Sequence, residues 1–181
     1  MKTIGFFTAM LALCLSSAIL AAAPLTDSQK AKVQTALTQF QLLGSDPQVV
    51  DAVKAANSQP PAAYKGMTQD TWAALTLLSP EVKYFSQNDL AKYLKTKRTE
   101  IVTELFVSAA DGTKVAFFAK TSNWSHKGKP KHDLPMAGKT WIGETEQDAS
   151  TGKVQVQISF PVLDGQKAIG SIVIGLDLTK L

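Results

Sequence analysis

The segment 103–119 constrains the fold more than any other part of this 181-residue chain. Two runs rich in β-branched and aromatic residues flank Asp111-Gly112 there, and this pair is one of the strongest sequence signals for a β-hairpin. Two further runs, at 154–160 and 168–178, are joined through Asp164-Gly165 in the same way. The C-terminal half is therefore predicted to form a mainly antiparallel sheet.

Two amphipathic helices are predicted before the hairpins. Thr26 and Gln29 fit a capping box at the start of the first helix, whose apolar residues recur at helical spacing. Asp46 followed by Pro47 is typical of the start of the second, because the carboxylate caps free amide groups and proline suits the first turn. These helices open a helical part that spans residues 26–98.

Two shorter helices are predicted to complete this part. Thr68 is expected to cap one of them, which Ser79-Pro80 would end, and Ser86 is expected to cap the other. From residue 101 the periodicity changes to two, which places the sheet at residues 101–178. The predicted fold class is therefore α+β, with N-terminal helices packed on the sheet.

The last predicted strand is largely apolar on both faces, which is typical of a central strand. Ser171, Gly175 and Asp177 share one of these faces with larger apolar residues. A glycine inside a strand often allows a ligand or a second backbone to come close, and a carboxylate on the same face requires a partner. A cavity is therefore expected against this face.

The first 22 residues have the three regions of a secretory signal peptide. Met1-Lys2 is a short positive start, residues 4–20 are apolar and almost uncharged, and Ala21-Ala22-Ala23 is a small-residue end around the expected cleavage position. An uncleaved membrane anchor is the alternative, but residues 4–20 are short for a span, which needs about 20 residues. We expect cleavage near Ala22 and export to the periplasm.

The mature segment, residues 23–181, is predicted to be a single domain. The only cysteine of the chain, Cys14, lies in the signal segment, which excludes a disulfide framework. The net charge of +4 is mild, and the dense basic stripe of a nucleic-acid binder is not found. No second run reaches membrane-spanning length, so no membrane insertion of the mature chain is expected.

A long polar segment, residues 121–152, separates the two hairpins, and loops of this length are more often functional than structural filler. Trp124 and Trp141 offer rigid apolar area for a ligand. Lys129, with the lysines at 127 and 131, offers positive charge for an anionic group. The alternatives are that Trp141 belongs to the core and that the lysines form a solvated surface.

Two acidic residues are candidates for holding an amine or a hydroxyl of the same ligand. These are Asp148, near the end of the polar segment, and Asp177, on the last strand. The alternative for Asp148 is that it merely begins the turn at 148–152. A ligand that carries both a carboxylate and an ammonium group would suit such a combination of residues.

Metal chemistry and catalysis find little support in the sequence. His126, His132 and Asp133 suggest a metal site, but their spacing matches no compact zinc pattern and no cysteine supports it. We expect no metal and no other cofactor, and we count His126 among the ligand-binding candidates. No nucleophile, base and orienting acid can be recognised, so the chain is predicted not to be an enzyme.

Several short segments have an order and spacing that are fairly specific when taken together: Glu104–Gly112, Thr121–Trp124, Trp141–Glu144, Asp148–Gly152, Val156–Pro161 and Ala168–Gly175. In these segments the chain resembles the extracytoplasmic Cache-type, PAS-like sensor domains, which are also called PDC domains. The resemblance covers residues 46–178. It implies N-terminal helices on one face of a five-stranded sheet, and a small-molecule pocket on the other face beneath the connection from the second to the third strand.

The resemblance also implies roles for individual residues. In amino-acid-binding relatives, aromatic residues in that connection cover the ligand, and an acid on the last strand holds its ammonium group. Trp124 and Asp177 match these positions. Where such relatives have an arginine and aromatic neighbours, this chain has Ser-His-Lys at 125–127, a departure that bears on the ligand class.

The function that the resemblance implies is a soluble periplasmic sensor module that binds a small polar, carboxylate-bearing molecule of the amino-acid or organic-acid class. Because the chain ends at Leu181, soon after the last strand, we expect it to act with a membrane-bound receptor or to buffer a metabolite. The alternative is an accessory domain that contacts another periplasmic protein and binds no small molecule.

Overall fold

The computed structural model describes residues 24–147 and 153–181. The helices are α1 (Asp27–Phe40), α2 (Pro47–Ser58), α3 (Gln69–Ala74), α4 (Pro80–Gln87), α5 (Asp89–Thr96) and α6 (Pro130–Met136), with short 3-10 turns at Gln41–Ser45 and Ala62–Tyr64. The strands are β1 (Val102–Ala109), β2 (Lys114–Phe117), β3 (Trp141–Gln147), β4 (Val154–Asp164) and β5 (Lys167–Asp177). No helix in these two ranges has the length and apolar character required to cross a bilayer. The predicted signal segment and Asp148 lie outside the described residues.

The five strands form one antiparallel sheet in the order β2-β1-β5-β4-β3. The α+β fold class is confirmed, and so is the central position of the last strand, which pairs with β1 and β4. Gly112 and Gly165 lie in the two predicted hairpin turns with φ of 82° and 61°. These left-handed conformations favour glycine and allow each turn to close.

Most of the predicted helix starts are confirmed. The Thr26 hydroxyl accepts a hydrogen bond from the backbone amide of Gln29 at 3.2 Å, and Thr68 caps α3 in the same way. The carboxylate of Asp46 caps α2, where Pro47 occupies the first turn. Local capping chemistry therefore determines where these three helices begin.

Two predicted helix boundaries are wrong. Ser86 lies inside α4, and the cap of α5 is Asn88, whose side chain accepts from the amide of Ala91 at 2.8 Å. Asn88 also donates to the carbonyl of Val115 at 2.8 Å, a long-range contact that attaches α5 to β2. Ser79-Pro80 starts α4 rather than ending α3, because proline is tolerated in the first turn of a helix.

The polar segment 121–152 contains α6 and β3, although its residue pattern predicts a loop. The helix is short, begins at Pro130 and includes Pro135, so its sequence lacks a helical signature. The strand β3 lies at an edge of the sheet and its residues are largely exposed, so it shows no apolar alternation. The five strands implied by the family resemblance are nevertheless all present.

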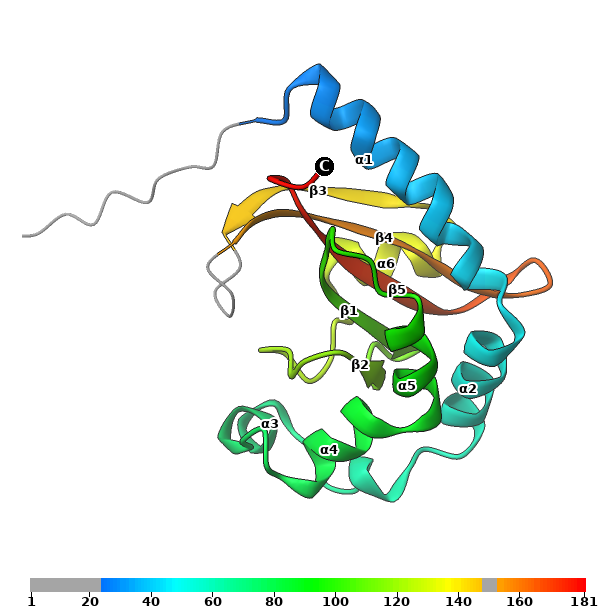
Figure 1. Ribbon diagram of the computed structural model, residues 1–181. Helices are drawn as coiled ribbons and strands as arrows, with labels where there is room; N and C mark the ends of the chain where they lie inside the picture. Colours follow the sequence, from blue (N-terminus) through cyan, green and yellow to red (C-terminus); the bar gives the residue numbers. More distant parts are fainter. Residues whose placement is uncertain (1–23, 148–152) are drawn as a thin grey trace, which may run out of the picture.

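The main core lies on one face of the sheet, beneath α1, α2 and α5. Alternate residues of the central strands point into it, among them Leu105, Val107, Ile158, Ile172 and Ile174. Because side chains alternate across a strand, the residues between them face the opposite side of the sheet, where Figure 1 shows α6. The candidate site lies on that opposite side.

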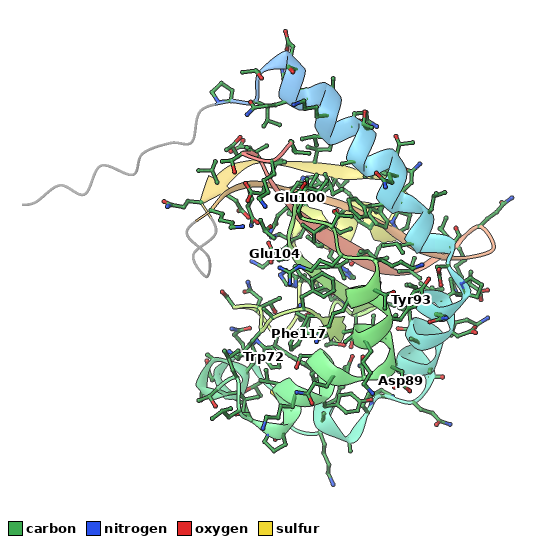
Figure 2. All side chains as sticks on the ribbon, in the orientation of Figure 1. Trp72, Asp89, Tyr93, Glu100, Glu104 and Phe117 are labelled. Carbon is green, nitrogen blue, oxygen red and sulfur yellow. The ribbon has the colours of Figure 1, made fainter. Side chains whose placement is uncertain are left out.

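A smaller aromatic cluster joins α3 and α4 to β2 and to the connection that follows β2. Its members are Trp72, Phe85, Phe106, Phe117 and Trp124, together with Tyr64 at its margin. Trp72 and Phe117 lie side by side in Figure 2, with ring centroids 5.9 Å apart. The Trp72 indole also donates to the carbonyl of Thr121 at 2.7 Å, which anchors the connection to α3.

Two substitutions on β4 test this division between core and surface. Ile158 is fully buried, so Ile158→Ala is expected to lower the free energy of unfolding by about 2–5 kcal/mol in urea titrations. Val154 on the same strand is 43% exposed, and Val154→Ala is expected to cost less than about 1 kcal/mol. Equal losses from the two variants would contradict the assignment of the core face.

Candidate functional site

The connection from β2 to β3 is held on the sheet by a buried hydrogen bond between His132 of α6 and Ser171 of β5. The His132 Nδ1 atom lies 2.8 Å from the Ser171 Oγ atom, and both residues are at most 1% exposed. The His132 Nε2 atom lies 3.3 Å from the carbonyl oxygen of Ala110, which can only accept. His132 therefore donates from Nε2 and accepts the Ser171 hydroxyl proton at Nδ1.

A second histidine of the connection forms a buried pair with a lysine of β2. The Nζ atom of Lys114 lies 2.5 Å from the Nδ1 atom of His126, and the imidazole stacks on Phe106 with ring centroids 4.6 Å apart. Lys114 is fully buried and also lies over the Phe106 ring, 4.8 Å from its centroid. Two basic side chains are thus removed from water at the same point.

Burial determines the protonation of this pair. Loss of solvation lowers the pKa of Lys114 well below its usual value, and the nearby Lys131 charge acts in the same direction while Glu104 opposes it. Loss of solvation lowers the pKa of His126 to about 2, and the neighbouring Lys114 and Lys131 act in the same direction. The imidazole is therefore neutral at physiological pH.

A polar network on β1 and β4 adjoins the pair. The Glu104 carboxylate accepts hydrogen bonds from the side-chain amides of Gln155 at 3.0 Å and Gln157 at 2.5 Å. The ammonium group of Lys131, on α6, donates to the Gln157 side-chain carbonyl. Gln155 also donates to Glu146 of β3 at 3.1 Å, so the network spans three strands and one helix.

These groups border a cavity of about 230 Å³ on the sheet face opposite the N-terminal helices. Its walls carry both signs of charge and include Glu104, Lys120, His126, Lys131, Glu146 and Gln157, with residues 121–123 of the connection along one side. Larger grooves of about 410 Å³ and 500 Å³ lie beside α2 and along β3. We choose the smaller cavity because buried polar groups with displaced pKa values converge there.

The sequence matches no protein-family model and no curated protein. Among solved structures, the sensor domain of the V. cholerae histidine kinase DctB is similar, with 16% identity over 84% of this chain and a TM-score of 0.50. The chain therefore has the fold of this domain, as its resemblance to the Cache-type family implies. It spans 53% of that solved domain, about half of its length.

Two chemoreceptor domains are more distantly similar to this chain. The sensory domain of Tlp3 from Campylobacter jejuni has 13% identity over 82% of this chain and 63% of its own, with a TM-score of 0.43. The ligand-binding domain of CtaA from Pseudomonas fluorescens, solved with L-serine, has 15% identity over 85% and 56%, with a TM-score of 0.40.

Of the predicted site residues, His126 borders the cavity, whereas Trp124 and Trp141 lie elsewhere in the described part of the chain. Trp124 is 7% exposed and packs in the aromatic cluster, 4.9 Å from the ring centroid of Tyr64 and 5.2 Å from that of Trp72. Trp141 opens β3 and borders the groove along that strand. Trp124 therefore holds the connection in place rather than covering the cavity.

The charged candidates are also dispersed over the described part of the chain. Lys129 lies at the N-terminal boundary of α6, and Asp148 belongs to the stretch that is not described. Asp177 is buried at the other end of β5, where its carboxylate accepts from Thr179 at 2.6 Å and pairs with Lys153 at 3.1 Å. These contacts, led by the Thr179 hydrogen bond, lower the pKa of Asp177.

Sequence reasoning did not select Glu104, Gln155 and Gln157 as site residues. The alternation of β4 shows both glutamines on the polar face, and Glu104 stands out in an apolar strand, so a local signal existed. His126, His132 and Asp133 do not form a metal site, and no three metal-ligating side chains converge within residues 24–147 and 153–181. The two histidines contact Lys114 and Ser171 instead.

The lowered pKa of His126 predicts a specific dependence of stability on pH. Below about pH 6.5 the unfolded chain binds a proton at this residue and the folded domain does not, so acid favours unfolding. Relative to His126→Gln, the wild type should lose up to about 1.4 kcal/mol of unfolding free energy per pH unit below that value. Chemical unfolding between about pH 4 and about pH 7 measures this difference, and parallel curves would contradict it.

Proposed function

We propose that this chain is a periplasmic ligand-binding sensor module that recognises a small, polar, carboxylate-bearing metabolite and performs no chemistry on it. The observation that carries the proposal is the polar cavity beneath the connection, where Lys131, His126 and Glu104 converge. The Cache-type fold adds support, because the similar V. cholerae structure is itself a sensor domain. Export depends on the signal segment proposed for residues 1–22.

The charges of the cavity define the class of ligand. Lys131 and Lys120 provide cations for a carboxylate, and Glu104 and Glu146 provide acceptors for an ammonium or hydroxyl group. Gln157 offers an amide whose two ends already contact Lys131 and Glu104, so it keeps the two signs of charge apart. Amino acids and hydroxy acids match this arrangement.

Ligand occupancy has two uses in this proposal. A bound metabolite that draws Lys131 and residues 121–123 together would change the surface of the connection, and a membrane-bound receptor that contacts this surface would read the change. Alternatively, the module buffers the free concentration of the metabolite. Both uses require reversible binding with the free protein already folded.

A second candidate function is protein docking without a small-molecule ligand. Leu77 and Leu78, between α3 and α4, are 68% and 77% exposed, and Tyr84 of α4 is 43% exposed. Neighbouring exposed apolar side chains often mark a contact with another protein. Substitution of Leu77 and Leu78 by serine would abolish docking in this case and leave ligand binding unchanged.

Thermal-shift screening of amino acids and organic acids tests the proposal. At a hundredfold excess over its dissociation constant, a ligand stabilises the fold by about 2.7 kcal/mol, which raises the melting temperature by roughly 5–10 °C. Lys131→Met should weaken binding by about tenfold or more, because a charge-assisted contact to the carboxylate is lost. Burial lowers the pKa of Lys131, so loss of its charge should not destabilise the fold.

Lys139→Met is the matched control. Lys139 is exposed and lies beyond the end of α6, and its substitution removes the same charge as Lys131→Met. It should bind as the wild type does. If no acid shifts the melting temperature, or if both variants bind equally well, the proposed ligand site is wrong.

A further inference from the structure

The contact between Lys114 and His126 is unusual for a buried lysine beside a polar cavity. Fully buried lysines normally contact a carboxylate, whereas the amine of Lys114 meets a neutral imidazole and the face of Phe106. Neither partner carries a charge that neutralises an ammonium ion. His126 itself borders the cavity, so its ring separates the buried amine from the space where a ligand would lie.

The ionisable groups around the pair include both bases and acids. Lys131 and His132 of α6 and Lys129 at the start of that helix face His126, and each lowers its pKa. The acids include Glu104 of β1, which raises the pKa of Lys114, Glu146 of β3, which raises that of Lys131, and Asp133 of α6, which raises that of His132. Glu104 and Glu146 accept hydrogen bonds from Gln155, so part of their charge is already engaged.

Two further ionisable groups, Tyr64 and Asp111, lie near the pair. The backbone carbonyl of Lys114 accepts the hydroxyl proton of Tyr64, a phenol whose pKa burial raises to about 12 and which therefore stays neutral. The charge of Asp111, in the turn between β1 and β2, also raises the pKa of Tyr64 and that of His132. Within this mixed environment, Lys114 and His126 are two bases in direct contact, which a single anion would complement.

We propose that the Lys114 and His126 pair is the anion-binding element of the cavity, and that it takes up one proton when a carboxylate enters. This inference rests on the proposed ligand-binding function and adds the group that holds the carboxylate. It commits the site to ligands with a carboxylate that His126 can reach.

The proton count follows from the geometry. In the free protein, full burial against the uncharged rings of His126 and Phe106 favours the neutral Lys114 amine; on binding, this amine gains a proton from solvent, becomes an ammonium group and donates to Nδ1. Once Lys114 is an ammonium group it can only donate, so in the complex the Nδ1 atom of His126 accepts and the ring proton lies on Nε2, which can donate to a carboxylate oxygen. The ligand stays ionised and no covalent bond changes, so the complex holds one proton more than the free protein and free carboxylate together.

Ser108 offers an acceptor for the new ammonium group. It is the cross-strand partner of Lys114 on β1, and it is fully buried. Its hydroxyl oxygen has no hydrogen-bond partner within residues 24–147 and 153–181. Side chains of cross-strand partners lie about 4.5–5.5 Å apart at Cβ, within reach of a lysine amine. The Ser108 hydroxyl oxygen is therefore available to accept a hydrogen bond from the ammonium form of Lys114.

Acetate, the smallest suitable carboxylate with a methyl group, is the probe that tests the inference. Calorimetric titration in phosphate and in Tris, which differ in ionisation heat, gives the number of protons taken up on binding. We expect a value approaching one for the wild type, and an affinity that falls by up to about tenfold per pH unit between about pH 7 and about pH 9.

Lys114→Met keeps the apolar contact with Phe106 and removes the amine. It should fold, lose the proton uptake and lose the pH dependence of acetate binding. Lys127→Met removes an exposed lysine next to His126 and should keep both. The wild-type proton count requires no variant, so the test stands even if Lys114→Met does not fold.

Three results would overturn the inference. They are acetate binding without proton uptake, unchanged proton uptake in a folded Lys114→Met protein, and no acetate binding up to about 100 mM. If another acid from the thermal-shift screen binds in any of these cases, the proposed function survives and only the role of the pair is lost. If neither acetate nor any screened acid binds, both are wrong.

Discussion

The hydrogen bond between His132 and Ser171 is the contact on which the site depends. It attaches α6 to the central strand through two buried side chains, so the connection from β2 to β3 lies across the sheet rather than in solvent. At its other end, the connection is anchored by Trp124 in the aromatic cluster and by the bond from Trp72 to Thr121. The cavity lies between these two anchors.

One sheet serves two purposes because its side chains alternate. The face toward α1, α2 and α5 is almost entirely apolar, and its burial supplies the main driving force for folding. The other face carries Glu104, Ser108 and Gln157 at positions that a second apolar layer would normally occupy. Buried polar residues cost free energy unless they are hydrogen-bonded; Glu104 and Gln157 bond to each other here, whereas the Ser108 hydroxyl has no partner within the described residues.

The sequence predicted the features that depend on local chemistry and missed those that depend on distant contacts. The hairpins at Gly112 and Gly165 and the caps at Thr26 and Asp46 follow from neighbouring residues, and they are confirmed. The cap at Asn88 was missed in favour of Ser86, because the second bond of Asn88 goes to Val115 on another element. Likewise, Glu104 meets Gln155 and Gln157 only after β5 has placed β1 and β4 on its two sides.

The central claim is that ligands bind beneath the connection, and NMR mapping of backbone amides during a titration with pooled amino and organic acids tests it most directly. The account predicts shifts concentrated at Asn123, His126 and Gln157, which border the cavity. Shifts confined to Asn57, Ala110 and Lys167, which border the larger groove beside α2, would contradict it.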